Sequence, residues 1–162
     1  MYLARAWRET RTAGDGPIAE EINLLFKPAR GLDIGCDSPA LQQALGATDN
    51  AYDLVVCRDA LERLAVLHMC EAIRHICRIS SRYVYISTRY HPSPAGLLDV
   101  AMQPTLDSSP ATLVNRDFLR VLFVLEGFRR REDLETRINE MRAGRALVYE
   151  QTERDRGGSV RA

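Results

Sequence analysis

Short apolar runs alternate with amphipathic stretches along most of this chain. Residues 31–36, 53–57 and 83–87 are mainly apolar and end at polar or glycine positions, which predicts three buried strands. Between the second and third runs, apolar residues recur at helical spacing from Leu61 to Ile79. They fill a wide stripe, which predicts one long helix packed against a sheet. Strands that alternate with helices indicate an α/β fold with a mainly parallel sheet.

Two shorter helices are predicted in the N-terminal part of the chain. Pro17 suits a first helical turn, and the apolar residues after it repeat at helical spacing as far as Phe26. Ser38 and Gly46 would cap and end a short helix over residues 39–45. Both helices flank the first predicted strand, as an α/β layer arrangement requires.

The C-terminal third is predicted to contain one clear helix and two late strands. Asn115 would cap a helix over residues 116–125. Residues 128–132 and 146–151 are predicted as strands, with residues 134–141 as a helical or irregular connection. These elements complete a three-layer sandwich.

A long proline-rich segment interrupts this pattern between residues 89 and 112. It holds four of the seven prolines, which break any long regular element. Residues 97–102 are predicted to form one or two helical turns. A loop of this length inside a compact domain is often functional, so we expect it to contribute to a substrate site.

Length and composition indicate a single globular domain. The chain has 162 residues, of which 46% are hydrophobic and 27% charged, and this excludes wholesale disorder. We expect an irregular N-terminal arm over residues 1–16, a domain over residues 17–151 and a mobile tail over residues 152–162.

Charge, hydropathy and cysteine usage narrow the possible partners and the cellular compartment. Formal net charge is zero, which argues against general nucleic-acid binding. No apolar run reaches the length of about 18 residues that a membrane span needs, and the N-terminus lacks a secretory signal. The four cysteines form no CxxC pair, so we expect a reducing, cytoplasmic protein.

Chemistry is expected where the predicted parallel strands end. The first strand ends around Asp33 and Gly35, and the second ends at Cys57, Arg58 and Asp59. Ligands of open α/β sheets bind beyond the carboxyl ends of the strands, and glycine there admits a close approach to the backbone. A carboxylate at such an end can accept hydrogen bonds from an amine or a ribose.

Two motifs carry a resemblance to a known family. Gly31-Leu32-Asp33-Ile34-Gly35-Cys36 is similar to the first motif of class I S-adenosylmethionine-dependent methyltransferases. The stretch Ala51-Tyr52-Asp53-Leu54-Val55-Val56-Cys57-Arg58-Asp59-Ala60-Leu61-Glu62-Arg63-Leu64 resembles the family's fourth-strand motif, FDLVV followed by LEHL. The resemblance covers about residues 17–151 and implies a reduced Rossmann-like sandwich with late antiparallel strands.

The resemblance also implies a cofactor and a site. The cofactor would be S-adenosylmethionine, and the substrate a small molecule or glycan. The methionine end would be held by Asp33, Gly35, Cys36 and Asp37, and the transfer site lined by Cys57, Arg58 and Asp59. Tyr90 and His91, just beyond the third strand, are candidates for substrate binding, with His91 as a general base.

The chain departs from the family pattern in two places. Asp37 and Pro39 stand where the family usually has glycines. Only 19 residues separate Asp33 from Asp53, where the family normally has two further strand–helix units that contact ribose and adenine. The first and fourth strands are neighbours in the family sheet, so a direct link keeps their pairing, provided that it crosses on the face giving a right-handed connection.

Three other residue groups have a structural interpretation beside a functional one. His68, Cys70, His75 and Cys77 are possible zinc ligands, but the two histidines are seven residues apart, about 10 Å along a helix, so a structural role is favoured. Arg129-Arg130-Arg131 precedes two acidic residues, which favours a solvated strand edge over phosphate binding. Tyr83 and Tyr85 share one sheet face, which favours core packing.

These observations leave three functional hypotheses. One is a compact methyltransferase of class I type. The second is a catalytically inactive module with the same fold, which serves as a binding or assembly partner and needs a protein partner or a second copy to cover its sheet edge. The third is a generic α/β binding domain that shares the motifs by chance. A structure in which residues 31–36 and 53–57 are not adjacent strands would support it and contradict the other two.

Overall fold

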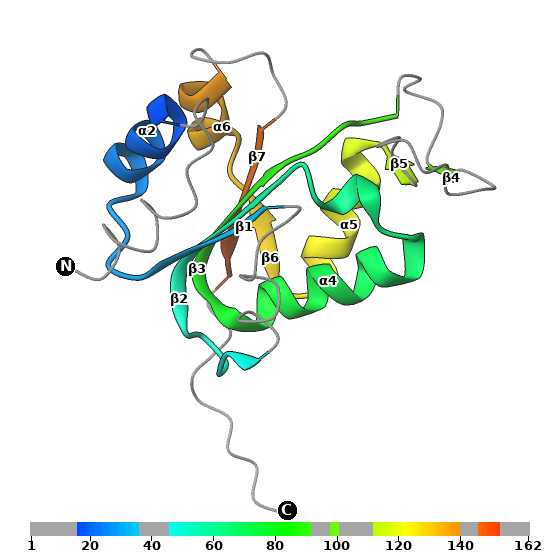
Figure 1. The fold of residues 1–162 in the computed structure, drawn as a ribbon, viewed down its shortest axis with the longest axis horizontal. Coiled ribbons are helices and arrows are strands. Elements are labelled where there is room, and N and C mark those ends of the chain that lie inside the picture. Colours follow the sequence, from blue (N-terminus) through cyan, green and yellow to red (C-terminus); the bar gives the residue numbers. More distant parts are fainter. Residues whose placement is uncertain (1–15, 36–45, 92–97, 101–111, 140–145, 153–162) are drawn as a thin grey trace, which may run out of the picture.

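Five strands form one mixed sheet in the computed structural model, which describes residues 16–35, 46–91, 98–100, 112–139 and 146–152. The strand order is β1 (Gly31–Gly35), β2 (Tyr52–Arg58), β3 (Ser80–Ser87), β7 (Ala146–Gln151) and β6 (Phe128–Arg130). The first three strands are parallel, and β7 is antiparallel to both of its neighbours. The predicted α/β class with late antiparallel strands is confirmed (Figure 1).

Helices cover both faces of this sheet and make three layers (Figure 1). Helices α4 (Val66–Ile79) and α5 (Arg116–Leu125) pack on one face, and α2 (Gly16–Phe26) and α6 (Glu132–Asn139) on the other. Alternate strand residues point to opposite faces, so each face has its own core. The first core, below α4 and α5, includes Leu32, Ile34, Val55, Cys57, Val84 and Ile86. The second core, below α2 and α6, includes Ile22, Leu54, Val56, Tyr85, Ile138 and Val148.

The two tyrosines of β3 take the packing role that their shared face predicts. Tyr85 is buried in the second core. Tyr83 packs at the rim of that core, with its ring centroid 5.2 Å from that of Phe26 at the end of α2. Their aromatic rings therefore anchor α2 to the sheet.

Strands β1 and β2 are adjacent and parallel, so the separation of these strands that would have favoured an unrelated domain is absent. Asp33 lies opposite Val56, and Gly35 opposite Arg58. The Asp53 carboxylate accepts hydrogen bonds from the backbone N–H groups of Ala29 and Arg30, at 2.7 and 2.8 Å. The acidic residue of the second motif therefore fixes the turn that leads into the first strand.

The described end of the β1–β2 link returns on the α4 face of the sheet. Ala47 packs against the first core. The Arg78 guanidinium, in the last turn of α4, donates to the Ala47 carbonyl at 2.9 Å and to the Asp49 carboxylate at 2.7 Å. This is the face that a right-handed crossover to a parallel neighbour requires, since β2 also reaches β3 through α4.

The prediction of one helix from Leu61 to Ile79 is wrong. A 3₁₀ turn, η1 (Leu61–Arg63), is followed by two residues in extended conformation, Leu64 and Ala65, before α4 begins. The Thr112 hydroxyl, from a distant strand, donates to the Leu64 carbonyl at 2.7 Å. A continuous helix would need that carbonyl for its own i→i−4 bond, so a long-range contact decides the break.

The expectation of helical turns over residues 97–102 is also wrong. Strand β4 (Leu98–Val100) pairs antiparallel with β5 (Thr112–Val114), because tertiary pairing outweighs the weak helical pattern of so short a segment. The strand predicted over 128–132 ends at Arg130, since Glu132 begins α6. The helix predicted over 39–45 lies outside the described residues, as do the N-terminal arm and the C-terminal tail except for Gly16 and Thr152. No helix among the described residues is long and apolar enough to cross a membrane.

We expect Asn115→Ala to lower the free energy of unfolding by about 1 kcal/mol, because it removes an N-cap. The Asn115 Oδ1 atom accepts from the Phe118 N–H at 2.7 Å and begins α5. Urea denaturation measures the loss. Arg120→Ala is the matched control, since it removes only an exposed ion pair at 3.7 Å and should change stability by about 0.5 kcal/mol or less. Equal losses in the two variants would contradict the capping role.

Candidate functional site

An ion pair joins the carboxyl ends of β1 and β2. The Arg58 guanidinium meets the Asp33 carboxylate with both Nε and Nη2, the first at 3.4 Å from Oδ1. The Asp33 side chain is 8% exposed and that of Arg58 17% exposed. The strand register places both side chains on the sheet face that α2 and α6 cover. Two predicted site residues are therefore direct partners, and each neutralises the charge of the other.

Gly35, beside the Asp33–Arg58 ion pair, leaves open space at the end of β1. An added Cβ at Gly35 would meet no atom of the described residues within 4 Å. Gly35 is the last residue of β1 and lies opposite Arg58. A ligand can therefore approach the backbone closely at this strand end. The next two predicted site residues, Cys36 and Asp37, lie outside the described residues.

The last residues of β2 differ in what they present. The Cys57 side chain is 1% exposed in the first core, so only its backbone is available to a ligand. Asp59 is exposed and has a φ of 49°, in the left-handed region that a non-glycine residue rarely adopts. Its N–H donates to the Ser87 carbonyl at 2.8 Å, which ties the turn after β2 to the end of β3. Backbone strain of this kind is concentrated at functional sites.

Tyr90 and His91 extend the line of β3 beyond its last residue. Tyr90 bridges Val114 of β5, and the His91 N–H donates to the Val114 carbonyl at 3.0 Å. The Arg116 guanidinium lies over the Tyr90 ring, 4.8 Å from its centroid. Burial raises the pKa of the Tyr90 phenol well above its usual range, although the nearby Arg116 charge partly opposes this. Tyr90 therefore stays protonated and can act as a hydrogen-bond donor.

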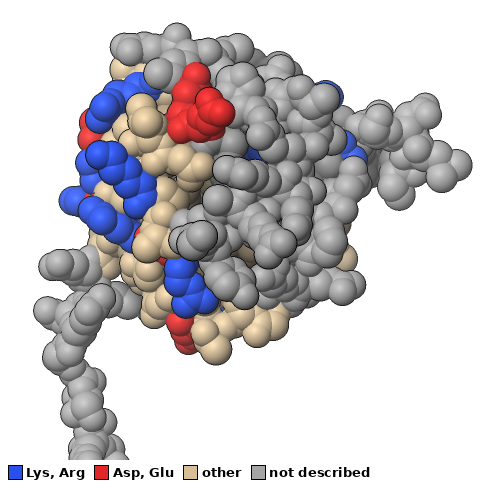
Figure 2. Space-filling model, turned by 60° about the vertical axis from the view of Figure 1, so that its left-hand side comes forward, with Lys and Arg blue, Asp and Glu red and all other residues tan. Residues whose placement is uncertain are grey.

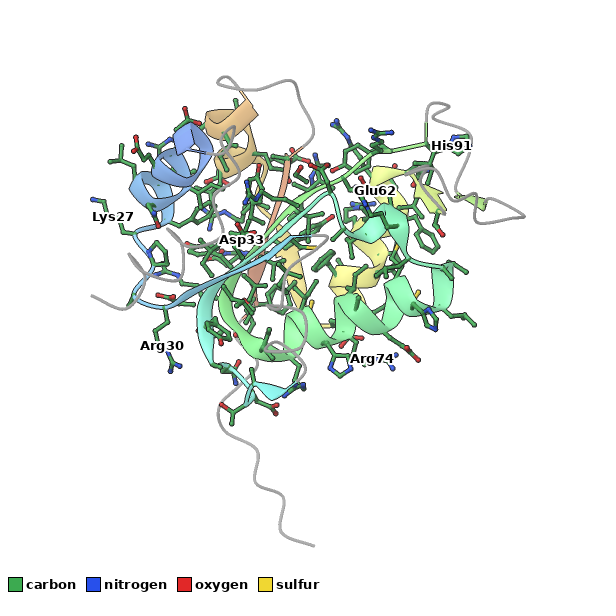
Figure 3. All side chains as sticks on the ribbon, in the orientation of Figure 1. Lys27, Arg30, Asp33, Glu62, Arg74 and His91 are labelled. Atoms are coloured by element: carbon green, nitrogen blue, oxygen red, sulfur yellow. The ribbon has the colours of Figure 1, made fainter. Side chains whose placement is uncertain are left out.

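The sequence analysis did not select Glu62, which lies between Asp33 and His91 in the view of Figure 3. Its side chain is buried in η1, and the Thr88 hydroxyl donates to its Oε2 atom at 2.5 Å. The available signal was its place in the Leu61-Glu62-Arg63-Leu64 motif, directly after the buried Leu61. A helix would put it on the same stripe as Val66 and Met69, so only its charge kept it out of the apolar pattern.

The histidines and cysteines of α4 do not assemble a metal site. His68 is exposed and Cys77 is buried in the first core. Burial raises the pKa of the Cys77 thiol, which keeps it protonated and chemically inert. The described residues contain no group of three or more potential metal ligands.

The arginine run of β6 is engaged by carboxylates. Figure 2 shows several Lys and Arg side chains gathered at one side of the described surface, with Asp and Glu close by. Arg129 and Arg131 both bind Glu150, at 2.9 and 2.6 Å, and Arg130 binds Glu135 at 2.8 Å. These arginines therefore form a paired strand edge, in agreement with the interpretation favoured by the sequence.

We expect Arg58→Met to lower the free energy of unfolding by about 2 kcal/mol, because it leaves the Asp33 carboxylate buried without its cation. This is less than a fully buried pair would lose, since Arg58 retains some exposure. Chemical denaturation measures the loss. The matched control is Arg129→Met, because Arg129 is 63% exposed and Glu150 keeps its contact with Arg131. A loss in Arg58→Met no larger than in this control would mean that the pair is dispensable for folding.

The positive φ at Asp59 predicts an unusual order of stability among variants at this position. We expect Asp59→Gly to be more stable than Asp59→Val by about 1–3 kcal/mol, because glycine adopts a positive φ freely and a β-branched residue does not. Thermal denaturation gives the order. At Arg89, an exposed coil residue of ordinary φ nearby, the valine variant should be at least as stable as the glycine variant. The same order at both positions would refute the strain.

Comparison with known proteins shows similarity at the level of the fold. No protein-family model and no curated protein matches the chain by sequence. Among solved structures, a SAM-dependent methyltransferase from Archaeoglobus fulgidus matches with a TM-score of 0.58 at 14% identity, over 93% of this chain and 98% of that one. A 1,6-didemethyltoxoflavin N1-methyltransferase from Burkholderia thailandensis matches with a TM-score of 0.57 at 12% identity, over 94% and 86%. A sugar N-methyltransferase from Streptoalloteichus matches with a TM-score of 0.54 at 12% identity, over 94% and 93%.

The match to magnesium protoporphyrin IX methyltransferase from Synechocystis PCC 6803, at 19% identity, spans only 43% of the length of that protein. The strand order and these likenesses agree on the architecture. The chain has the Rossmann-like fold of the class I S-adenosylmethionine-dependent methyltransferases.

Proposed function

We propose that this protein binds S-adenosylmethionine and transfers its methyl group to a small molecule or a sugar. The observation that carries the proposal is the carboxyl edge of β1 and β2. There Asp33, Gly35, Arg58 and Asp59 come together, and open space remains over Gly35. Two structural neighbours support the proposal. One is the 1,6-didemethyltoxoflavin N1-methyltransferase with bound S-adenosylhomocysteine, and the other is the sugar N-methyltransferase.

Each predicted site residue has a proposed role. Asp33 and Gly35 would hold the methionine end of the cofactor, together with Cys36 and Asp37. Arg58, Asp59 and the backbone of Cys57 would line the site of transfer. Tyr90 and His91 would contact the substrate, with the protonated Tyr90 phenol as a donor. These assignments combine the family resemblance with the positions described above.

When bound, the cofactor supplies an electrophilic methyl group on a sulfonium sulfur. The work left to this chain is orientation and exclusion of water. Open backbone at Gly35 would let the ligand approach β1, while the fixed turn at Asp59 would limit where the substrate enters. His91 would accept the proton that the methylated heteroatom releases.

A second proposal is a catalytically inactive module of the same fold. The Asp33 carboxylate is already paired with Arg58, which favours a structural role for it. Strand β1 ends the described sheet, and exposed sheet edges commonly pair with another chain. Such a module would bind a protein partner or a second copy along β1. Among the described cysteines, Cys70 and Cys77 form no disulfide, which fits a cytoplasmic setting for either proposal.

Titration calorimetry with S-adenosylhomocysteine tests the first proposal. We expect a dissociation constant below about 100 μM, equivalent to roughly 5.5 kcal/mol. Gly35→Val should abolish binding without unfolding the protein, because its side chain enters open space. Gly46→Val is the matched control, since a Cβ there also meets no atom within 4 Å, away from the strand ends.

The outcomes separate the two proposals. Binding that Gly35→Val removes and Gly46→Val retains supports the cofactor site. Absence of heat, together with an unchanged melting temperature at millimolar ligand, contradicts it and favours the inactive module. In that case a monomer at all concentrations in ultracentrifugation would count against self-association through β1.

A further inference from the structure

The two halves of the candidate site meet at η1. One half is the turn after β2, with Arg58 and Asp59, and the other is the segment after β3, with Tyr90 and His91. The η1 turn follows the first half directly in sequence and contacts β5, to which the second half is bonded. Figure 3 shows Glu62 of η1 between Asp33 and His91 in this view.

A buried hydrogen bond connects η1 to the end of β3. The Glu62 side chain is 5% exposed and that of Thr88 is 2% exposed. The Thr88 hydroxyl donates to Glu62 Oε2 at 2.5 Å. Within the described residues, no arginine, lysine or histidine forms an ion pair with Glu62. This carboxylate therefore has a neutral hydroxyl as its partner.

Three further bonds continue the connection on both sides. The Asp59 N–H donates to the Ser87 carbonyl at 2.8 Å, next to Thr88. The Thr112 hydroxyl donates to the Leu64 carbonyl at 2.7 Å, one residue beyond η1. The His91 N–H then donates to the Val114 carbonyl at 3.0 Å. Four hydrogen bonds, joined by short stretches of backbone, thus connect the end of β2 through η1 and β5 to His91.

A carboxylate in this position is costly for stability alone. Removing a charge from water without a cation partner is unfavourable, and an apolar side chain of similar size would fill the same volume without that penalty. A carboxylate oxygen does what an apolar group cannot, because it accepts a hydrogen bond from the Thr88 hydroxyl and fixes η1 at a set position. The arrangement therefore favours geometric precision over stability.

We propose that Glu62 is a positioning residue which, through Thr88, sets the Arg58–Asp59 turn and the Tyr90–His91 segment relative to each other. This inference rests on the proposed function, since those two segments are the proposed cofactor and substrate sides of one site. Glu62 acts on the ligand indirectly, through the backbone that it holds.

The experiment compares variants along β3. Glu62→Ala and Thr88→Val remove the acceptor and the donor of the bond, and Glu62→Gln keeps an acceptor oxygen. Ser80→Ala is the matched control, because Ser80 is also buried and its hydroxyl donates to the Tyr83 carbonyl at 2.9 Å, at the opposite end of β3. Two readouts are measured: the dissociation constant of S-adenosylhomocysteine by calorimetry, and amide hydrogen exchange at Asp59 and His91.

We expect Glu62→Ala and Thr88→Val each to weaken S-adenosylhomocysteine binding by about tenfold and to speed amide exchange at both positions by a similar factor. Glu62→Gln should restore most of both losses. Ser80→Ala should lower stability but leave the dissociation constant and these two amides unchanged. Thr88→Val is nearly isosteric, so it remains informative if Glu62→Ala does not fold.

Each contrary result has one meaning. If the site variants behave as Ser80→Ala does, the carboxylate is an ordinary buried group and the inference is wrong. Faster exchange with an unchanged dissociation constant limits Glu62 to local structure and also overturns it. If the unmodified protein does not bind S-adenosylhomocysteine, the proposed function fails, and unchanged exchange at Asp59 and His91 in Thr88→Val would then reject the connection by itself.

Discussion

The parallel register of β1 on β2 is the constraint on which the rest of the structure depends. It places Gly35 opposite Arg58 and so brings two strand ends, far apart in the sequence, to one edge. The same register sends Leu32 and Val55 into one core while Asp33 and Arg58 project from the other face. A slip of β1 by one residue along β2 would turn Asp33 toward the apolar side chains below α4 and separate it from Arg58.

Two features at this edge have opposite consequences for a ligand. The open space over Gly35 admits a close approach to the backbone. The Asp33 carboxylate, however, is already engaged by Arg58, so a ligand amine would have to share or displace that guanidinium. This competition separates the two proposals. The enzymatic proposal requires the Asp33–Arg58 pair to yield to a ligand, whereas the inactive module needs the pair only for folding.

The short connection between the first two strands shapes the whole sheet. The 19 residues between Asp33 and Asp53 leave β1 as the last strand of the described sheet. Because β1, β2 and β3 succeed one another in one direction, the described end of the first crossover and the whole of the second lie on the α4 side. At the far end of the sheet, β7 runs antiparallel to β6. Arg129 of β6 forms an ion pair with Glu150 of β7 there.

The sequence by itself determined the class of fold, the three parallel strands, the capped helix at Asn115 and the first two site motifs, because these follow from local apolar period, glycine and capping positions. It also indicated that Tyr85 belongs to the core, since side chains alternate along a strand. Tertiary structure alone decided the break before α4, the β4–β5 pair and the burial of Glu62. Each of these depends on a partner at least 12 residues away, such as Thr112 for Leu64 or Thr88 for Glu62, and local periodicity contains no record of such a contact. The pairing of Asp33 with Arg58 belongs to the same group, because the sequence supplied both charges but only the strand register brought them together.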